Sequence, residues 1–161
     1  MKKISLRDLE LIVYDFDGVM TDNTALLAAD GREFVRVNRS DGMAVGKLSE
    51  MGILQIILTS ETNPVVDARA RKLKLKVLSG IKDKQTALAR YCAKNGISLG
   101  KVLYIGNDIN DLRAMLSVGL PVCPSDAYAE IKAISVLVLK TAGGKGVVRE
   151  LLYYLTERRK T

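Results

Sequence analysis

Histidine is absent from the 161 residues of this chain. This absence excludes Ser-His-Asp and Cys-His catalysis, and every zinc site that needs a histidine ligand. Any general acid or base must therefore be a carboxylate, a lysine, a tyrosine or a cysteine. The two cysteines, Cys92 and Cys123, suggest neither a disulfide framework nor a zinc-binding spacing, so we expect both to be reduced core residues.

Long apolar runs are also missing, and none approaches the length of a membrane span. The start Met1-Lys2-Lys3 is typical of a signal peptide, but Arg7, Asp8 and Glu10 interrupt any hydrophobic segment behind it. We therefore expect a cytoplasmic protein with no membrane partner.

Aromatic residues make up only 5% of the chain, and 25 Lys and Arg residues against 18 Asp and Glu residues give a net charge of +7. The basic residues are scattered and form no stripe, and no recognisable nucleic-acid-binding motif accompanies them. We therefore expect no nucleic-acid partner. A modest positive charge instead suits a small anionic substrate, which it attracts over a distance.

The chain has enough apolar residues, 48% of its length, for one core, and its length predicts a single domain over residues 1–161. Short apolar runs alternate with amphipathic stretches, which predicts an α/β fold, a parallel sheet with helices on both faces. The expected strands are at 11–14, 53–58, 77–78, 102–105, 120–123 and 136–139. In the simplest Rossmann-like, doubly wound order, strand 11–14 is central, between strands 53–58 and 102–105.

One insertion interrupts this alternation. Residues 26–28 and 34–37 are short β-prone runs, and the segment Ala29-Asp30-Gly31-Arg32 between them is typical of a turn. This pattern predicts a β-hairpin at about 24–38. Because two strands alone are only marginally stable, the hairpin must pack on something else, such as another subunit.

Two helices near the predicted site have readable starts. Ser40-Asp41-Gly42 predicts the cap of one helix, whose apolar positions begin with Met43. Asn63-Pro64 predicts the start of the next helix, with Arg69 on its outward face.

Two aspartates, Asp15 and Asp17, directly follow the first strand, at the end where ligands bind in an open parallel sheet. Two carboxylates so close repel each other unless a cation or a proton separates them, which indicates a divalent-metal site, an acid–base pair, or both. They could also simply end a strand at a solvated turn. The predicted strand order brings Thr59 and the segment Asn107–Asp111 to the same edge, which favours a functional site.

Together these segments resemble the four motifs of the haloacid dehalogenase (HAD) superfamily over nearly the whole chain. The motifs, in order, are Asp15-Phe16-Asp17-Gly18-Val19-Met20-Thr21, Leu58-Thr59-Ser60, Lys84 and Gly106-Asn107-Asp108-Ile109-Asn110-Asp111. Four motifs in the family's order make this resemblance highly specific. It implies a HAD-like fold and a magnesium-dependent phosphomonoesterase.

The resemblance also implies a role for each motif residue. Asp15 would attack phosphorus and form an aspartyl-phosphate, and Asp17 would protonate the leaving oxygen and then activate water. Thr59 would hydrogen-bond a phosphoryl oxygen, and Lys84 would offset the charge of the nucleophile and the phosphate. Mg²⁺ would bridge Asp15, the backbone carbonyl of Asp17, the last motif and the phosphate.

One position departs from the family pattern. The last motif usually begins Gly-Asp, and that Asp ligates the metal, whereas position 107 is Asn. An amide oxygen can ligate Mg²⁺, but the site loses one negative charge, and Asp108 is the alternative ligand. Asp111 matches the closing carboxylate of the motif and would orient its neighbours.

Most members of the superfamily carry a cap domain, for which 161 residues leave no room. The hairpin and the segment Gly143–Glu150 are similar to the capless branch of phosphatases that act on 3-deoxy-2-keto sugar acid phosphates. Members of that branch are typically homotetramers in which the hairpins associate and a neighbouring subunit covers the site. The resemblance therefore implies a homotetramer formed through the hairpin.

The residues after Thr59 separate two substrate predictions. Ser60-Glu61 resembles the nonulosonate branch, so a nine-carbon nonulosonate 9-phosphate is the main expectation. Octulosonate enzymes usually have Gly-Arg at these positions, and 3-deoxy-octulosonate 8-phosphate is the alternative. An Arg would bind the sugar carboxylate, whereas Glu61 would reject it and accept hydroxyls.

Three basic residues, Arg69, Lys72 and Lys145, complete the predicted substrate-binding set with Thr59, Ser60, Glu61 and Lys84. In the nonulosonate branch Lys72 would supply the positive group for a neighbour's substrate, although Arg69 and Lys72 also fit a solvated helix face. Lys145 lies in Gly143–Gly146, which predicts a mobile loop able to close over a ligand, although helix capping would explain it too.

Two other classes of protein remain alternatives. Receiver domains of signalling proteins share the topology, an acidic pocket, a Thr and a Lys, but their phosphorylated Asp lies on the third strand, and Lys76-Val77-Leu78-Ser79 has none. The C-terminal domain of some sialic-acid cytidylyltransferases serves assembly more than catalysis, and Asn107 is compatible with such a weakly active or inactive domain. Magnesium-dependent activity that Asp15→Asn abolishes would separate an enzyme from an assembly domain.

Overall fold

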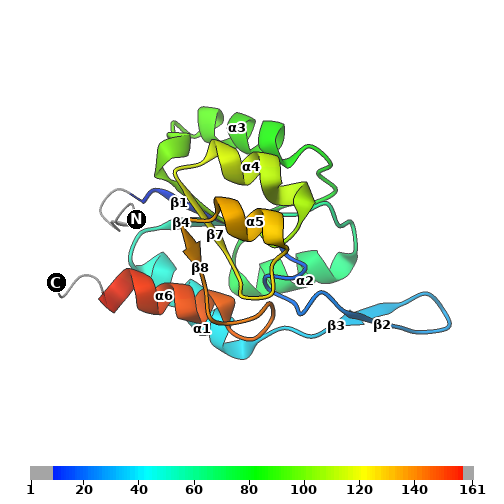
Figure 1. Ribbon diagram of the computed structural model, residues 1–161. Helices are drawn as coiled ribbons and strands as arrows, with labels where there is room; N and C mark the ends of the chain where they lie inside the picture. The colour runs from blue at the N-terminus through cyan, green and yellow to red at the C-terminus, as the bar shows by residue number, and fades with distance from the viewer. Residues whose placement is uncertain (1–8, 158–161) are drawn as a thin grey trace.

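The computed structural model describes residues 9–157, so the two ends of the predicted domain, 1–8 and 158–161, lie outside the described residues. Its centre is a six-stranded parallel sheet in the order β5-β4-β1-β6-β7-β8 (Figure 1). The strands are β1 (Leu11–Tyr14), β4 (Leu54–Leu58), β5 (Lys76–Leu78), β6 (Val102–Ile105), β7 (Leu120–Cys123) and β8 (Leu137–Val138). β1 pairs with β4 on one side and with β6 on the other, which confirms the predicted Rossmann-like order.

Helices cover both faces of this sheet (Figure 1). One face carries α1 (Arg39–Glu50), α2 (Pro64–Leu73) and α6 (Val147–Glu157), and the other carries α3 (Lys84–Lys94), α4 (Leu112–Ser117) and α5 (Ala129–Ile134). Two short 3-10 helices, η2 (Leu99–Lys101) and η3 (Ile109–Asp111), precede β6 and α4. Among the helices of residues 9–157, none is long and apolar enough to cross a membrane.

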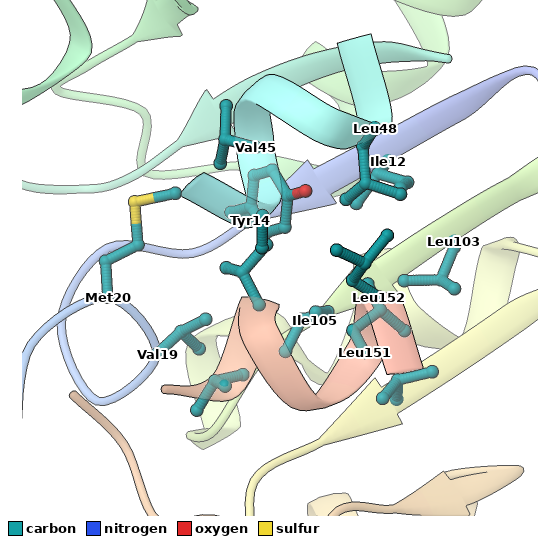
Figure 2. Close-up of a cluster of buried hydrophobic side chains, with 14 of the residues drawn as sticks. Ile12, Tyr14, Val19, Met20, Val45, Leu48, Leu103, Ile105, Leu151 and Leu152 are labelled. Carbon is teal, nitrogen blue, oxygen red and sulfur yellow. The ribbon is translucent and has the colours of Figure 1, made fainter. Parts of the chain in front are cut away.

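Each face of the sheet has its own hydrophobic core, because side chains alternate along a strand. Ile12 and Tyr14 of β1 pack with α1 and α6 (Figure 2), whereas Leu11 and Val13 pack with α3 and α4. All four side chains are fully buried, as a central parallel strand requires. This burial fixes the position of Asp15, which follows β1 directly.

The predicted hairpin is present, and it projects from the body of the molecule (Figure 1). Its strands, β2 (Ala25–Leu27) and β3 (Glu33–Val35), form a separate antiparallel sheet. The side chains of Leu26, Leu27 and Phe34 are 72%, 66% and 52% exposed. The hairpin therefore presents an apolar surface that its own chain leaves open to solvent.

The prediction that Ser40-Asp41-Gly42 caps α1 is wrong. The N-cap is Asn38, whose Oδ1 accepts a hydrogen bond from the Ser40 N–H at 2.8 Å. Asp41 lies inside the helix and is buried, and its Oδ1 accepts a hydrogen bond at 3.0 Å from the backbone N–H of Arg149 in α6. The Asp41 carboxylate thus caps a different helix from the one that contains it.

Two side chains are oriented opposite to the prediction. Met43 of α1 is exposed, because Ala44, Val45 and Leu48 form the face that meets the sheet. Arg69 of α2, predicted to face solvent, is buried, and its Nη2 donates to the Asn38 carbonyl at 2.8 Å. The Asn38 carbonyl at the start of α1 and the nearby Asp41 carboxylate attract this guanidinium inward.

The glycine loop before α6 is packed against the loop that follows Asp17. A Cβ on Gly143 would collide with the Gly18 carbonyl, and one on Gly144 would collide with the backbone N of Asp22. The Gly144 N–H donates to the Val19 carbonyl at 3.0 Å, and the Gly143 N–H donates to Asp126 Oδ1 at 2.9 Å. In this structure the predicted mobile loop is therefore tied down, and the glycines serve close backbone approach.

Candidate active site

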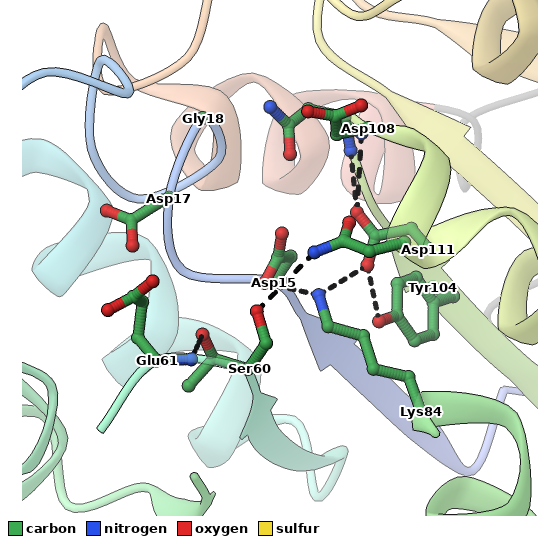
Figure 3. Close-up of polar contacts among 12 residues, drawn as sticks. Asp15, Asp17, Gly18, Ser60, Glu61, Lys84, Tyr104, Asp108 and Asp111 are labelled. Carbon is green, nitrogen blue, oxygen red and sulfur yellow. Dashed lines mark hydrogen bonds and ion pairs between the residues drawn. The ribbon is translucent and has the colours of Figure 1, made fainter. Parts of the chain in front are cut away.

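The carboxyl ends of β1, β4 and β6 meet at one edge of the sheet, where the predicted polar segments follow them (Figure 3). They surround a cavity of about 130 Å³ lined by Asp15, Asp17, Asn23, Thr59, Ser60, Glu61, Asn107, Asp108 and Asn110. All of these except Asn23 and Asn110 belong to the predicted site residues. Asn23 was not predicted from the sequence, because it lies just before the hairpin and belongs to none of the four motifs.

Lys84 is the first residue of α3, and its side chain points toward Asp15 and Asp111 (Figure 3). Its Nζ lies 2.8 Å from Asp15 Oδ1 and 2.7 Å from Asp111 Oδ1. All three residues are buried, with Asp15 4% exposed, Lys84 2% and Asp111 0%. One ammonium therefore bridges two carboxylates that would otherwise repel each other without solvent screening.

The same burial makes the protonation of Asp15 sensitive to its surroundings. Burial and the neighbouring Asp111 carboxylate raise the pKa of Asp15 to about 8, against the opposing pull of Lys84. Burial by itself would lower the pKa of Lys84, but Asp15 and Asp111 outweigh it and raise that pKa, so the amine stays protonated. Any further positive charge at this site would favour the ionised Asp15 carboxylate.

Asp111 is held from several sides. Tyr104 Oη donates to Asp111 Oδ1 at 2.8 Å, and the backbone N–H of Asn107 donates to Oδ2 at 3.0 Å. The Asp111 side chain also lies against Gly106, where a Cβ would not fit. Sequence reasoning identified Asp111 as an orienting residue but missed Tyr104, which looks like one more core residue of the apolar β6 segment.

Asp17 is less enclosed than Asp15. Its Oδ1 accepts a hydrogen bond from Thr21 Oγ1 at 2.9 Å. Burial raises the pKa of Asp17, Thr21 opposes that shift, and the Glu33 carboxylate adds to it. The pKa therefore moves toward the range in which a carboxyl group can act as an acid near neutral pH.

The Thr59 hydroxyl is almost fully buried at the end of β4. Its Oγ1 accepts a hydrogen bond from the Glu61 N–H at 3.1 Å, which leaves the hydroxyl proton available to a ligand. Next to it, Ser60 Oγ accepts a hydrogen bond from Asn110 Nδ2 at 3.5 Å, a contact between the loops after β4 and β6. Asn110 lies within the fourth motif, but the sequence alone predicted no role for it.

Asn107 is buried, and its Oδ1 has no hydrogen-bond partner among the described residues. Its amide packs against Gly18, where a Cβ would collide with it. The alternative ligand, Asp108, uses its Oδ1 to accept the Ile109 N–H at 2.6 Å as the cap of η3. Among the described residues of the last motif, the Asn107 amide oxygen is the buried side-chain oxygen that has no partner.

This set of donors fits Mg²⁺ better than a softer metal. Within residues 9–157, no three Asp, Glu, His or Cys side chains gather as a metal site. Mg²⁺, however, commonly uses one or two carboxylates, other hard oxygen ligands and several waters. The Asp15 carboxylate and the unpartnered Asn107 oxygen, which both line the smaller cavity, are hard oxygen ligands of this kind.

A second cavity, of about 220 Å³, adjoins the first at Asp17, Asn23 and Glu61. Its lining residues are Phe16, Asp17, Asn23, Thr24, Ala25, Glu33, Val35, Glu61, Asn63, Val65 and Val66. Asn63 Nδ2 donates to Glu33 Oε2 at 2.8 Å, which holds the hairpin against the start of α2. The charged groups in this lining are carboxylates, so the cavity suits hydroxyl donors and repels a carboxylate.

Lys84 contacts Asp15 but lines neither cavity, and three more of the predicted binding residues also lie outside both cavities. Arg69 is buried against α1, and Lys72 is exposed on α2. Lys145 Nζ lies 3.7 Å from Asp22 Oδ2 and lines a separate groove beside α6. The roles of these three residues in substrate binding stay predictions.

Residues 57–151 match the family of haloacid dehalogenase-like hydrolases. Among characterised relatives, the 3-deoxy-D-manno-octulosonate 8-phosphate phosphatase of Yersinia pestis is 31% identical over 145 residues. The alignment covers 89% of this chain and 78% of the Yersinia protein. The resemblance that the motifs suggested is therefore found over most of both chains.

Solved structures agree with this similarity. A HAD family hydrolase from Streptomyces avermitilis superposes with a TM-score of 0.92 at 43% identity, over 94% of this chain and 87% of its own. The 3-deoxy-D-manno-octulosonate 8-phosphate phosphatase of Moraxella catarrhalis, solved with a magnesium ion, a phosphate ion and a KDO molecule, gives 0.90 at 30% identity, over 93% and 87%. Because the family match covers more than half of the chain, this protein belongs to the haloacid dehalogenase-like hydrolases.

Proposed function

We propose that this hydrolase is a phosphatase that removes the phosphate from a 3-deoxy-2-keto sugar acid phosphate, with 3-deoxy-D-manno-octulosonate 8-phosphate as its substrate. The observation that carries the proposal is the buried Asp15–Lys84–Asp111 arrangement, with the Asp17 carboxyl group and the Thr59 hydroxyl at the same cavity. This arrangement supplies a nucleophile, its charge partner, an acid and a phosphate-binding group, all of which phosphoryl transfer requires.

In the first half of the reaction, Asp15 attacks the phosphorus atom. A bond forms between a carboxylate oxygen of Asp15 and phosphorus, and the bond from phosphorus to the sugar oxygen breaks. Asp17, whose pKa is raised by burial, gives its proton to that leaving oxygen. Lys84 and the free hydroxyl proton of Thr59 offset the negative charge as it moves.

In the second half, water replaces the Asp15 oxygen on phosphorus. Asp17, now ionised, takes a proton from the water as it attacks, and the Asp15 carboxylate is released together with inorganic phosphate. Both halves therefore use Asp17, first as an acid and then as a base. Burial is the main cause of the raised pKa of Asp17, and the Glu33 carboxylate of the hairpin adds to it.

Mg²⁺ fits the polar end of this cavity, and Asp15, Asn107 and the backbone carbonyl of Asp17 would hold it. When bound, it would neutralise charge on the nucleophile and the phosphate, and so help two anions approach each other. Asp108 could offer only its second oxygen to the ion without giving up a cap, because its Oδ1 accepts a hydrogen bond at the start of η3.

The leaving group would occupy the second cavity, next to Asp17. Glu33 and Glu61 would accept hydrogen bonds from sugar hydroxyls near the phosphate, and the substrate carboxylate would point away from them. The nine-carbon preference predicted from Glu61 stays a prediction. The relatives from Yersinia and Moraxella favour the eight-carbon alternative, which we adopt.

We further propose that the active form is the predicted homotetramer, in which the exposed hairpin surface of one chain packs against those of its neighbours. A chain without a cap domain leaves the second cavity open at the hairpin, and a neighbouring chain would close it. Lys72 or Lys145 of a neighbour could then supply the positive charge that this cavity lacks in its own lining.

The test is release of inorganic phosphate from the eight-carbon 8-phosphate and the nine-carbon 9-phosphate, each with Mg²⁺ and with a chelator. We expect Mg²⁺-dependent turnover that is faster for the eight-carbon substrate. Asp15→Asn should abolish it, whereas Asp67→Asn, which removes a carboxylate of α2 outside both cavities, should not.

Each outcome bears on a different part of the proposal. Faster turnover of the nine-carbon substrate would overturn the substrate assignment and support the prediction from Glu61. No turnover of either compound by folded, magnesium-loaded protein would overturn the phosphatase proposal and favour an assembly domain.

A further inference from the structure

Tyr104 is a buried tyrosine that the mechanism above does not use. It lies in β6, between Val13 of β1 and Pro121 of β7, and its side chain is 0% exposed. Its hydroxyl donates to Asp111 Oδ1 at 2.8 Å (Figure 3). Burial and the two nearby carboxylates raise the pKa of Tyr104 well above its ordinary value, so the hydroxyl stays a donor.

This hydrogen bond belongs to a continuous chain of contacts that ends at the nucleophile. Asp111 Oδ1 accepts from both Tyr104 and Lys84, and the same Lys84 ammonium contacts Asp15. The other Asp111 oxygen accepts the backbone N–H of Asn107. These four side chains lie between β1, β6 and α3, where they are buried away from solvent.

Lys84 needs this support, because its side chain has four rotatable carbon bonds and reaches the site from another element. The backbone N–H of Asn107 holds Asp111 Oδ2, but the other oxygen, Oδ1, is the one that contacts Lys84 and needs a donor of its own to stay in place. Tyr104 has a rigid ring in a packed strand, so its hydroxyl is a fixed point against which Asp111 is held. An error of about 1 Å in such a constellation can cost about 100-fold in rate.

We propose that Tyr104 is a positioning residue for phosphoryl transfer, which holds Asp111 and thereby keeps the Lys84 ammonium against the Asp15 nucleophile. This inference rests on the proposed function, with Asp15 as the nucleophile. Tyr104 does not line either cavity, so we expect its loss to affect the chemical step more than substrate binding.

The chain offers a matched control in Tyr14. This residue lies on the neighbouring strand β1, is also 0% exposed, and donates from its hydroxyl to Gln55 Oε1 at 2.7 Å. Its ring packs on the α1–α6 side of the sheet, whereas Tyr104 packs on the α3–α4 side. Tyr14→Phe and Tyr104→Phe therefore each delete one buried, hydrogen-bonded hydroxyl. Only Tyr104→Phe removes a hydrogen bond that leads through Asp111 and Lys84 to Asp15.

The experiment compares wild type, Tyr14→Phe and Tyr104→Phe as full chains at saturating Mg²⁺, with 3-deoxy-D-manno-octulosonate 8-phosphate and with p-nitrophenyl phosphate. Tyr104→Phe should lower kcat about 10- to 100-fold and change KM less than about twofold, the range seen when supporting hydrogen bonds are removed. Tyr14→Phe should leave both constants within about twofold. Thermal unfolding of all three proteins shows whether any loss of activity is due to a loss of stability.

A crystal structure of Tyr104→Phe supplies a readout that does not depend on activity. We expect Lys84 Nζ to move away from Asp15 Oδ1, beyond the 2.8 Å of the wild-type contact. An unmoved Lys84, or a kcat equal to that of Tyr14→Phe, would overturn the inference. If wild type itself releases no phosphate, the proposed function fails, and the position of Lys84 in the variant still decides whether Tyr104 holds it.

Discussion

Asn107 places an uncharged oxygen where the family motif usually carries a carboxylate. Its Oδ1 is buried and has no partner among the described residues, so the position is ready to accept a cation but contributes no charge to it. A buried site that lacks one negative charge binds a divalent cation less tightly, because attraction between charges is stronger where water is excluded. If Asn107 holds Mg²⁺ as proposed, the site attracts the ion with one negative charge fewer than the usual motif provides.

We predict that Asn107→Asp increases Mg²⁺ affinity about tenfold, which corresponds to about 1.4 kcal/mol. Isothermal titration calorimetry of the two proteins at the same pH measures the difference directly. Asn95→Asp, at the exposed end of α3, adds the same charge far from the site and should leave the affinity unchanged. Equal affinities for Asn107→Asp and wild type would show that position 107 does not hold the ion.

A second prediction concerns pH. Without metal, the pKa of Asp15 is raised to about 8, so at lower pH this carboxyl group carries a proton that Mg²⁺ must displace. The Mg²⁺ affinity should therefore rise about tenfold per pH unit as the pH approaches 8, and level off above it. Calorimetric titrations at pH 6, 7, 8 and 9 measure this slope. A flat profile over that range would contradict the prediction.

At the scale of elements, α1 and α6 are joined by a contact between residues 108 positions apart. Asp41 of α1 accepts the backbone N–H of Arg149 in the first turn of α6. Burial raises the pKa of Asp41, and the two backbone donors of α6 and the nearby Arg69 oppose that shift. From within α1, this carboxylate therefore caps the start of α6 and lies close enough to Arg69 for their opposite charges to attract.

We predict that Asp41→Ala lowers the free energy of unfolding by about 2–4 kcal/mol, because it removes the cap of α6 and a buried negative charge that offsets the charge of Arg69. For a chain of this size, that change lowers Tm by roughly 5–15 °C, which calorimetry or circular dichroism can measure. Glu50→Ala removes a carboxylate from the exposed end of the same helix, and its effect should be smaller than about 1 kcal/mol. Similar Tm values for the two variants would rule out the capping role of Asp41.

The same contact explains why the sequence predicts helices better than it predicts their caps. Asn38, Ser40 and Asp41 are all residues that favour the start of a helix, and local pattern alone does not say which backbone N–H each of them meets. Asn38 caps its own helix, whereas Asp41 meets a helix that comes much later in the chain. Arg69 was misplaced for the same reason, because its partners lie on α1.

At the scale of the molecule, the strand order and the meeting of Asp15, Thr59 and Asn107 could be predicted, because parallel strands bring their carboxyl ends to one edge. The residues that hold these side chains in place could not be predicted from the sequence. Tyr104 reads as a core residue, and only its position opposite Val13 in the sheet brings its hydroxyl to Asp111. Motifs identify groups that do chemistry, whereas positioning groups depend on packing that a single sequence does not display.

The hairpin exposes an apolar surface that needs a partner to cover it. Within residues 9–157, β2 and β3 pair only with each other, and a two-stranded sheet is marginally stable in water unless it packs on another surface. Leu26, Leu27 and Phe34 are large apolar side chains that are mostly exposed to solvent. Their burial against identical hairpins would therefore stabilise both the hairpin and the assembly.

We predict that wild type is a tetramer in solution and that the double substitution Leu26→Glu with Phe34→Glu dissociates it, because two charges per chain would face each other in the shared apolar contact. Light scattering after gel filtration, or sedimentation velocity, measures the mass of both proteins. Leu116→Glu, which changes an exposed leucine of α4, should leave the tetramer intact. A monomeric wild type, or a double variant that remains a tetramer, would exclude the hairpin as the assembly surface and require another explanation for its exposed side chains.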